Sequence, residues 1–311
     1  MPLLRTAMMA AAAQPWLRRF SERSPLVRPV VNRFIAGATE PDALRVCQEL
    51  VDGGMYATLD FLGEDTTSRE QADKTVAAYL SVLPALADAG LADRIEVSIK
   101  LTAFGQGLPD GEKISLDNAH DVCVAAAAAG TTVTLDMEDH TTTDKTLGTL
   151  AELRKEFPWV GIVLQSYLTR TEGDCRDLAT AGSRVRLCKG AYAEPPSVAY
   201  QGSAVEDSYR RCLAILFAGD GYPMIASHDP AMALAARDEA DRNGRAADSY
   251  EFQMLYGFCV DRQRQLVEAG RRMRIYVPYG TEWYGYYMRR MAERPANLMM
   301  FVRSIATREG W

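Results

Sequence analysis

Histidine, paired cysteine and long apolar runs are all scarce in this sequence. The 311 residues include three histidines, and none of the six cysteines forms a C-x-x-C pair. Without a local cluster of His and Cys ligands, we expect neither a zinc site nor a zinc-dependent mechanism. The scattered cysteines also argue against a disulfide scaffold and suit a reducing compartment. No run of about 18 apolar residues is present, which excludes a membrane-spanning helix.

Positive charge is also scarce, except at the N-terminus. The net charge of −6 disfavours broad nucleic-acid binding, which relies on Lys and Arg. Residues 1–40 nevertheless carry six arginines against Glu22 and Glu40, a balance of +4 that leaves −10 for the rest. The apolar stretch 6–13 is too short and too weakly hydrophobic for a signal peptide. We therefore expect a cytoplasmic protein with a basic helical arm at 1–40 and a main domain at 41–311.

The arm has two interpretations, because residues 16–36 mix Arg with Trp, Phe, Leu and Val. The favoured one is a pair of helices packed on the main domain. The alternative is an amphipathic segment that attaches the protein peripherally to the inner face of the cell membrane.

From residue 41 onward, strand-like runs alternate with helix-length segments. Segments such as 69–89, 116–129 and 205–217 have apolar residues at a spacing near 3.6, as amphipathic helices do. The runs typical of strands lie at 55–62, 94–101, 131–137, 160–165, 184–188, 222–227, 250–255 and 273–278. Eight strand–helix units of this kind predict a parallel sheet closed into a (βα)8 TIM-type barrel of about 250 residues. A doubly wound open sheet is the alternative, although no G-x-G-x-x-G follows the first strand.

The strands carry a second pattern, because alternate residues point to opposite faces. If the apolar faces pack under the outer helices, the polar faces point into the barrel. The charged residues on these polar faces are Glu96, Lys100, Asp136, Arg184 and Arg186. Unpaired buried charges cost several kcal/mol each, so they form an internal ion-pair network or, as we favour, contact a polar cofactor or substrate.

Active sites of TIM barrels lie at the C-terminal strand ends. The polar residues at or just past those ends are Lys100, Asp136, Gln165, Lys189, His228 and Gln253.

A helix predicted at 282–294 follows the eighth strand and carries Tyr286, Arg289, Arg290 and Glu293. Taken alone, such a helix is typical of a solvated surface with i,i+4 pairs. Adjacent arginines point about 100° apart, so both reach one small target only if the helix crosses a cavity. In that position, two Arg forks together with Lys100 would hold an amino-acid carboxylate.

Seven strings, in this order along 95–297, resemble the motifs of the proline dehydrogenase family. They are VSIKLTAFG (97–105), LDMED (135–139), LQSYLTRT (164–171), RVRLCKGAY (184–192), SHD (227–229), YEFQMLYG (250–257) and IYVPYGTEWYGYYMRRMAERPAN (275–297). The resemblance implies a distorted barrel that binds FAD without a Rossmann fingerprint, with the last helix over the barrel mouth. It also implies oxidation of L-proline to Δ1-pyrroline-5-carboxylate, with electrons passed to a membrane quinone.

The resemblance assigns roles by position. Lys100, Arg289 and Arg290 look like the carboxylate clamp, with Asp136 and Glu293 orienting the charged partners. Tyr276, Tyr286, Leu255 and Ala191 look like the walls around the proline ring. Arg186 resembles the family's arginine near the reactive N5 edge of the flavin. The other cofactor contacts would be Met137, Gln165, Cys188, Lys189, Gly190, Ala191, Tyr192, Ser227, His228, Asp229, Gln253, Leu255, Arg290 and Glu293.

Three residues depart from the family pattern. Cys188 stands where valine is commoner, Ala193 where a larger side chain often follows the KGAY string, and Asp229 where longer relatives carry Asn. Asp229 would place a negative charge near a predicted phosphate or adenine contact. The length leaves no room for the aldehyde-oxidising domain of bifunctional members, so we expect a separate pyrroline-5-carboxylate dehydrogenase to take the product.

Two other functions stay open from the residues alone. One is a Schiff-base barrel lyase that uses Lys100 or Lys189 as its amine nucleophile. The other is a catalytically silent barrel that binds an amino acid. Within the favoured hypothesis, the residues around Tyr276 and Tyr286 do not distinguish proline from hydroxyproline.

Overall fold

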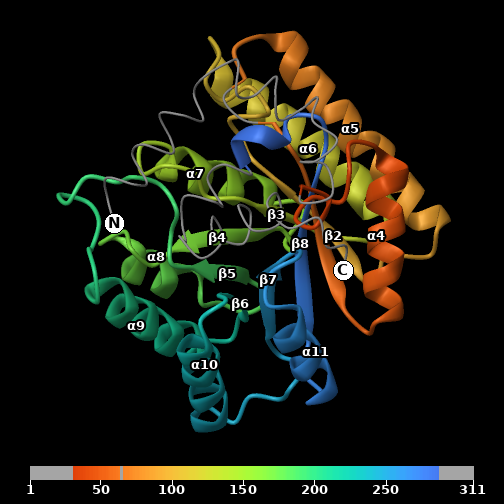
Figure 1. Cartoon of the computed structure of the whole chain (residues 1–311). Helices are drawn as coiled ribbons and strands as arrows, with labels where there is room; N and C mark the ends of the chain where they lie inside the picture. Colours follow the sequence, from red (N-terminus) through yellow and green to blue (C-terminus); the bar gives the residue numbers. More distant parts are fainter. Residues whose placement is uncertain (1–30, 64–65, 287–311) are drawn as a thin grey trace, which may run out of the picture.

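The fold is a closed barrel of eight parallel strands surrounded by helices (Figure 1). The computed structural model describes residues 31–63 and 66–286. Each strand pairs with the next, and β8 pairs with β1. The strands are β1 (Tyr56–Phe61), β2 (Ile95–Ile99), β3 (Val133–Leu135), β4 (Gly161–Gln165), β5 (Arg184–Cys188), β6 (Tyr222–Ala226), β7 (Glu251–Leu255) and β8 (Met273–Tyr279). The barrel prediction is confirmed, and the open doubly wound sheet is wrong.

A helix follows each of the first seven strands, and an additional helix precedes β1. They are α4 (Glu40–Asp52), α5 (Arg69–Asp88), α6 (Gly111–Ala129), α7 (Thr143–Leu153), α8 (Thr171–Leu178), α9 (Ala204–Ala218), α10 (Pro230–Arg242) and α11 (Val260–Glu268). The core lies between the strands and this outer ring, because the outward strand residues are apolar. On β2, for example, Ile95, Val97 and Ile99 are buried on the helix-facing side.

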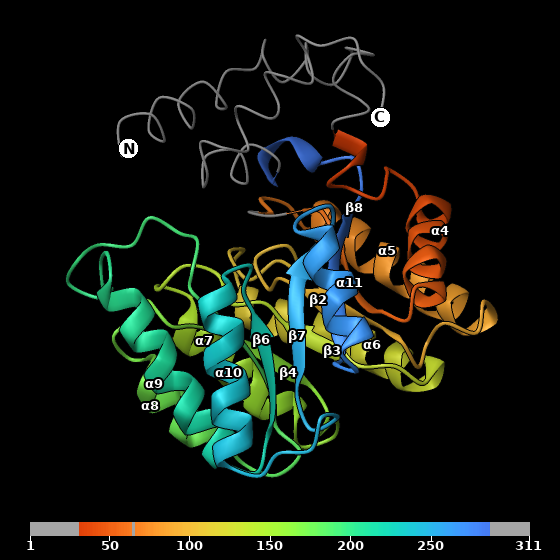
Figure 2. The same ribbon diagram turned by 60° about the horizontal axis from the view of Figure 1, so that its bottom comes forward.

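Helix α4 occupies the place beside β8 and β1 that the eighth helix of a regular (βα)8 barrel would take. It contacts both strands and the neighbouring α5, and Figure 2 shows it on the outside of the barrel. Its start is fixed by a capping box, in which the side chains of Thr39 and Asp42 each accept from the other's backbone N–H. Residues 283–286 begin a helix with Tyr284 and Tyr286 buried, and the remainder of the predicted helix 282–294 lies outside the described residues.

Part of the predicted N-terminal arm packs on the barrel. Phe34 is buried and stacks on Phe258, with ring centroids 4.6 Å apart. The N–H of Ala36 donates to the carbonyl of Pro278 at 3.0 Å, so residues 31–36 lie against the end of β8. Residues 1–30 lie outside the described part of the chain, and the role of the arm there stays a prediction. Among the described residues, no helix is both long and apolar enough to span a membrane.

Candidate active site

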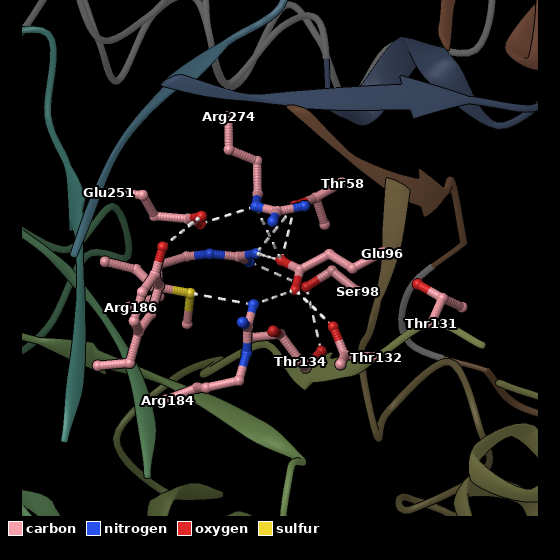
Figure 3. Close-up of polar contacts among 12 residues, drawn as sticks. Thr58, Glu96, Ser98, Thr131, Thr132, Thr134, Arg184, Arg186, Glu251 and Arg274 are labelled. Atoms are coloured by element: carbon pink, nitrogen blue, oxygen red, sulfur yellow. Dashed lines mark hydrogen bonds and ion pairs between the residues drawn. The ribbon is translucent and has the colours of Figure 1, made fainter. Parts of the chain in front are cut away.

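A ring of charges fills the N-terminal part of the barrel interior, and Figure 3 shows its contacts. Glu96, with 1% of its side chain exposed, pairs with Arg184 at 2.5 Å and with Arg186 at 3.1 Å. Arg274 lies 3.8 Å from Glu96 and forms a 2.7 Å ion pair with Glu251. Neither Glu96 nor Arg184 lines the cavity described below. For these two residues the ion-pair network is therefore the correct interpretation, and the expected ligand contact is wrong.

The arginines control the charge of Glu96. Burial alone would raise the pKa of this carboxyl, but Arg274, Arg184 and Arg186 outweigh burial and hold the pKa at about 2. Burial lowers the pKa of Arg274, whereas the carboxylates of Glu251 and Glu96 raise it above its usual value. Glu96 and Arg274 therefore stay ionised at neutral pH, and the ion pairs of this network form a floor in the barrel interior.

Arg186 connects this floor with the layer above it. Its guanidinium donates to Glu96 below, and to the Asp136 carboxylate and the Ser98 hydroxyl above, the last two at 2.9 Å each. Its Nε donates to the side-chain oxygen of Gln253 at 2.6 Å. A guanidinium held on so many sides presents a positive charge at a fixed position.

The upper layer combines two carboxylates, a lysine and a tyrosine. Lys100 donates to both carboxylate oxygens of Asp60 at 2.7 Å and lies 3.8 Å from Asp136. The Tyr276 hydroxyl donates to Asp136 at 2.6 Å. Burial, together with the Asp136 and Asp60 charges, raises the pKa of Tyr276 well above its usual value, so the phenol stays protonated. Asp60 is absent from the residues predicted above, although it follows Thr58 on the polar face of β1 and the same alternation identifies it.

A cavity of about 360 Å³ opens above these residues at the C-terminal ends of the strands. Every residue in the described ranges to which the family resemblance assigns a catalytic, substrate or cofactor role lines it, so all of these residues lie in one site. These residues are Lys100, Asp136, Met137, Gln165, Arg186, Cys188, Lys189, Gly190, Ala191, Tyr192, Ser227, His228, Asp229, Gln253, Leu255, Tyr276 and Tyr286. Asp60, Val163, Ala226 and Met254 complete the lining. Arg289, Arg290 and Glu293 lie outside the described residues.

Contacts at the rim of the cavity explain how Asp229 is accommodated where longer relatives carry Asn. One oxygen of its carboxylate accepts from the N–H of Ala231 and caps α10, while the other pairs with Lys189 at 2.9 Å. Lys189 also lies 3.1 Å from Glu206. Here the extra negative charge has a cationic partner, and it also stabilises a helix N-terminus.

His228 lies beside this rim and has a fixed orientation. Its Nε2 accepts from the N–H of Leu255 at 3.0 Å, and its ring packs against Phe258 with centroids 5.5 Å apart. An accepting Nε2 requires the neutral ring with its proton on Nδ1. This geometry fits a positioned strand-end histidine that faces the cavity.

The lining suits a flat, polar redox cofactor. Arg186 supplies a buried cation, Gln165 and Gln253 supply amides, and Ala191 and Leu255 supply apolar contacts. A cation fixed in a site with little water favours a ligand that gains negative charge on reduction. The residues present therefore fit a flavin ring.

Comparisons with known proteins agree with this geometry. A family model described as proline dehydrogenase matches residues 43–303. A proline dehydrogenase of Deinococcus radiodurans is 36% identical over 97% of this chain and 98% of its own length. Proline dehydrogenase 1 of Bacillus subtilis is 34% identical over 88% of this chain and 90% of its own. Proline utilization A from Bdellovibrio bacteriovorus, inactivated by N-propargylglycine, superimposes with a TM-score of 0.80 at 28% identity, over 86% of this chain and 33% of that one.

Proposed function

The chain belongs to the proline dehydrogenase family and oxidises proline, and we propose that bound FAD is its oxidant and that a quinone accepts the electrons. The product would be Δ1-pyrroline-5-carboxylate, which a separate dehydrogenase would consume. The observation that carries the proposal is the convergence, in one cavity above Arg186, of all described residues to which the family resemblance assigns a role.

We assign the substrate end of the cavity to Lys100 and its neighbours. The Lys100 ammonium, together with Arg289 and Arg290 from the predicted last helix, would hold the proline carboxylate. The proline ring would be enclosed by four residues that line the same cavity as Lys100, namely Tyr276, Tyr286, Leu255 and Ala191. Asp136 orients the Tyr276 hydroxyl, and Glu293 would orient the arginines.

We assign the cofactor contacts to Arg186 and further residues of the same lining. Arg186 would lie near the reactive edge of the flavin, with Gln165, Lys189, Gly190, Ser227, His228 and Gln253 around the ring, ribityl chain and phosphates. When bound, FAD supplies the hydride acceptor. Met137, Cys188, Ala191, Tyr192, Asp229 and Leu255 would complete the contacts in the described residues, with Arg290 and Glu293 beyond them.

The chain's own contribution to the reaction is orientation in a dry site. The clamp on the carboxylate fixes the Cδ–H bond of proline, and the tyrosines exclude water from it. The guanidinium of Arg186 is fixed in advance of the reaction by Asp136, Ser98 and Gln253, so no reorganisation is needed when charge moves. Such a reaction depends more on the relative orientation of proline and cofactor than on a dedicated general base.

An anaerobic absorbance spectrum tests the proposal. The purified protein should show a flavin spectrum that L-proline bleaches, and the same titration with 4-hydroxyproline identifies the preferred substrate. A colourless protein in which borohydride traps a carbonyl substrate on lysine would instead support a lyase. Against that alternative, Lys100 and Lys189 both lie in ion pairs, whereas Schiff-base formation needs a free neutral amine. Proline binding without any flavin would support a silent binding protein.

Replacing Arg289 or Arg290 with Met should raise KM for proline while flavin stays bound. Loss of a charge-assisted hydrogen bond to the carboxylate costs roughly 1.5–3 kcal/mol, which is about 10- to 150-fold in KM. Steady-state kinetics with proline measures the effect. Arg69, exposed and paired with Asp73, offers a matched control, since Arg69→Met should leave KM unchanged. An unchanged KM in both variants would contradict the assignment of Arg289 and Arg290 to the proline carboxylate.

Deleting residues 1–30 should weaken association with anionic lipid vesicles if the basic arm contacts membranes. The deletion stops short of Val31 and Phe34, because both are buried on the barrel and their loss would disturb the fold. Cosedimentation with vesicles containing phosphatidylserine measures the association, and vesicles of phosphatidylcholine alone serve as the control. Equal binding by the full-length and shortened proteins would contradict the membrane contact and favour an arm that packs on the main domain.

A further inference from the structure

The loop between β5 and α9, residues 189–203, is the longest of the connections that follow strands β1 to β7. Its first residues, Lys189 to Tyr192, line the cavity. Long loops without regular structure lose much conformational entropy when they are ordered, so specific contacts must hold them. The contacts of this loop therefore determine how rigidly it is held where it lines the cavity.

The loop between β4 and α8 anchors the β5–α9 loop at two points. The N–H of Tyr167 donates to the carbonyl of Lys189 at 3.0 Å, and the N–H of Tyr200 donates to the carbonyl of Tyr167 at 2.7 Å. An isolated antiparallel bridge joins Leu168 to Ala199 next to the second point. The cavity-lining stretch begins at the first anchor.

Gly190 brings the backbone directly onto the Tyr167 ring. Its φ of +106° lies in the region that favours glycine, and an added Cβ would come within 2.4 Å of ring atoms. The ring thus supports the loop from below where it faces the cavity. This contact holds the backbone at Gly190, and other groups hold the residues that follow it.

Glu194 holds the loop at a later position through a buried side chain. Its side chain is 3% exposed, although its neighbours Ala193 and Pro195 are exposed. The carboxylate accepts from the Tyr167 hydroxyl at 3.2 Å and from the N–H of His140 at 3.0 Å, and it also pairs with Nδ1 of His140. His140, which follows Glu138 and Asp139, therefore has a pairing role.

These contacts join three successive loops of the barrel mouth. Tyr167 follows β4, Glu194 follows β5, and His140 follows β3, three residues after the cavity-lining Met137. Glu194 itself does not line the cavity. A single buried carboxylate therefore holds the loops that carry one wall of the site.

We propose that Glu194 is a positioning residue that, through His140 and Tyr167, fixes the 190–192 backbone for cofactor binding. This inference rests on the proposed function, since it takes the cofactor to be a flavin. Without the carboxylate, the anchors at Lys189 and Ala199 remain, but the stretch between them can sample other positions. Flavin binding would then have to order this stretch of backbone. The loss of conformational entropy would weaken flavin binding.

The test compares flavin release from the holoenzyme in Glu194→Gln and in the wild type. Glutamine keeps the shape but removes the charge that accepts three donors, and we expect about tenfold faster release of FAD on dilution. Recovery of FAD fluorescence reports the release. Hydrogen exchange of peptides covering 189–203 should accelerate in the same variant, while the urea midpoint changes little.

Glu156→Gln is the matched control, because Glu156 forms a second His–Glu pair, with His120 at 2.9 Å, that is exposed and lies outside the cavity lining. It should change neither release nor exchange. Unaltered FAD release and exchange in Glu194→Gln would overturn the inference. If that variant does not fold, Tyr167→Phe and His140→Ala, which each remove one donor, carry the same prediction. A wild-type protein without flavin would instead contradict the proposed function. The exchange rates would still test whether Glu194 fixes the 190–192 backbone.

Discussion

Replacing Glu96 with glutamine should lower the free energy of unfolding by about 3 kcal/mol at neutral pH. The charge of Glu96 lies among Arg184, Arg186 and Arg274, and glutamine would leave these cations without their shared partner. Holding the carboxyl pKa at about 2 instead of 4.5 independently corresponds to about 3 kcal/mol. Urea unfolding at pH 7 measures the difference.

The pH dependence gives a second check on Glu96. Its folded-state pKa is depressed, so its contribution is complete above about pH 4.5 and is lost as the pH falls toward 2. Wild-type stability should therefore decline more steeply in this window than that of Glu96→Gln. Glu49→Gln, which alters an exposed pair with Arg45, should cost less than about 1 kcal/mol at any of these pH values. Equal losses in the two variants would contradict the buried-network account.

Replacing Lys100 with methionine should reduce kcat/KM for proline by about thirtyfold or more. Truncating one partner of a buried, hydrogen-bonded charge pair costs roughly 2–5 kcal/mol in binding. Lys100 is 10% exposed, contacts both oxygens of Asp60 and faces the cavity, so methionine removes both the pair and the cation that would bind the carboxylate. Steady-state kinetics and the flavin spectrum together show whether the loss lies in substrate binding.

Asp60→Asn separates the two roles of Lys100. If Asp60 acts by orienting the ammonium, the double variant should lose less than the sum of the two single losses. Lys113→Met serves as the control, because Lys113 is exposed and paired with Asp117 within α6. Additive losses would mean that Asp60 and Lys100 act independently, and a normal kcat/KM in Lys100→Met would remove Lys100 from the substrate site.

The strand pattern accounts for most of the site that could be predicted. Because side chains alternate along a strand, the polar faces of β2, β3 and β5 are enough to identify Lys100, Asp136 and Arg186 as inward residues. The same rule extends to Asp60 on β1, where a single carboxylate among mostly apolar neighbours gives a weaker signal. Helix boundaries are less uniformly predicted, since the expected 205–217 is observed as Ala204–Ala218, whereas the expected 116–129 begins earlier and is observed as Gly111–Ala129.

Local periodicity is sufficient to predict the strand–helix units and the two faces of each strand, because any stretch of a dozen residues displays it. The pairing of the charges is different, since it joins residues that lie far apart in the chain. Glu96 pairs with Arg184, 88 residues away, Lys100 with Asp60, 40 away, and Glu194 with His140, 54 away. These pairings depend on the register of a closed barrel and on the paths of its loops. Both arise only when distant segments of the chain pack together.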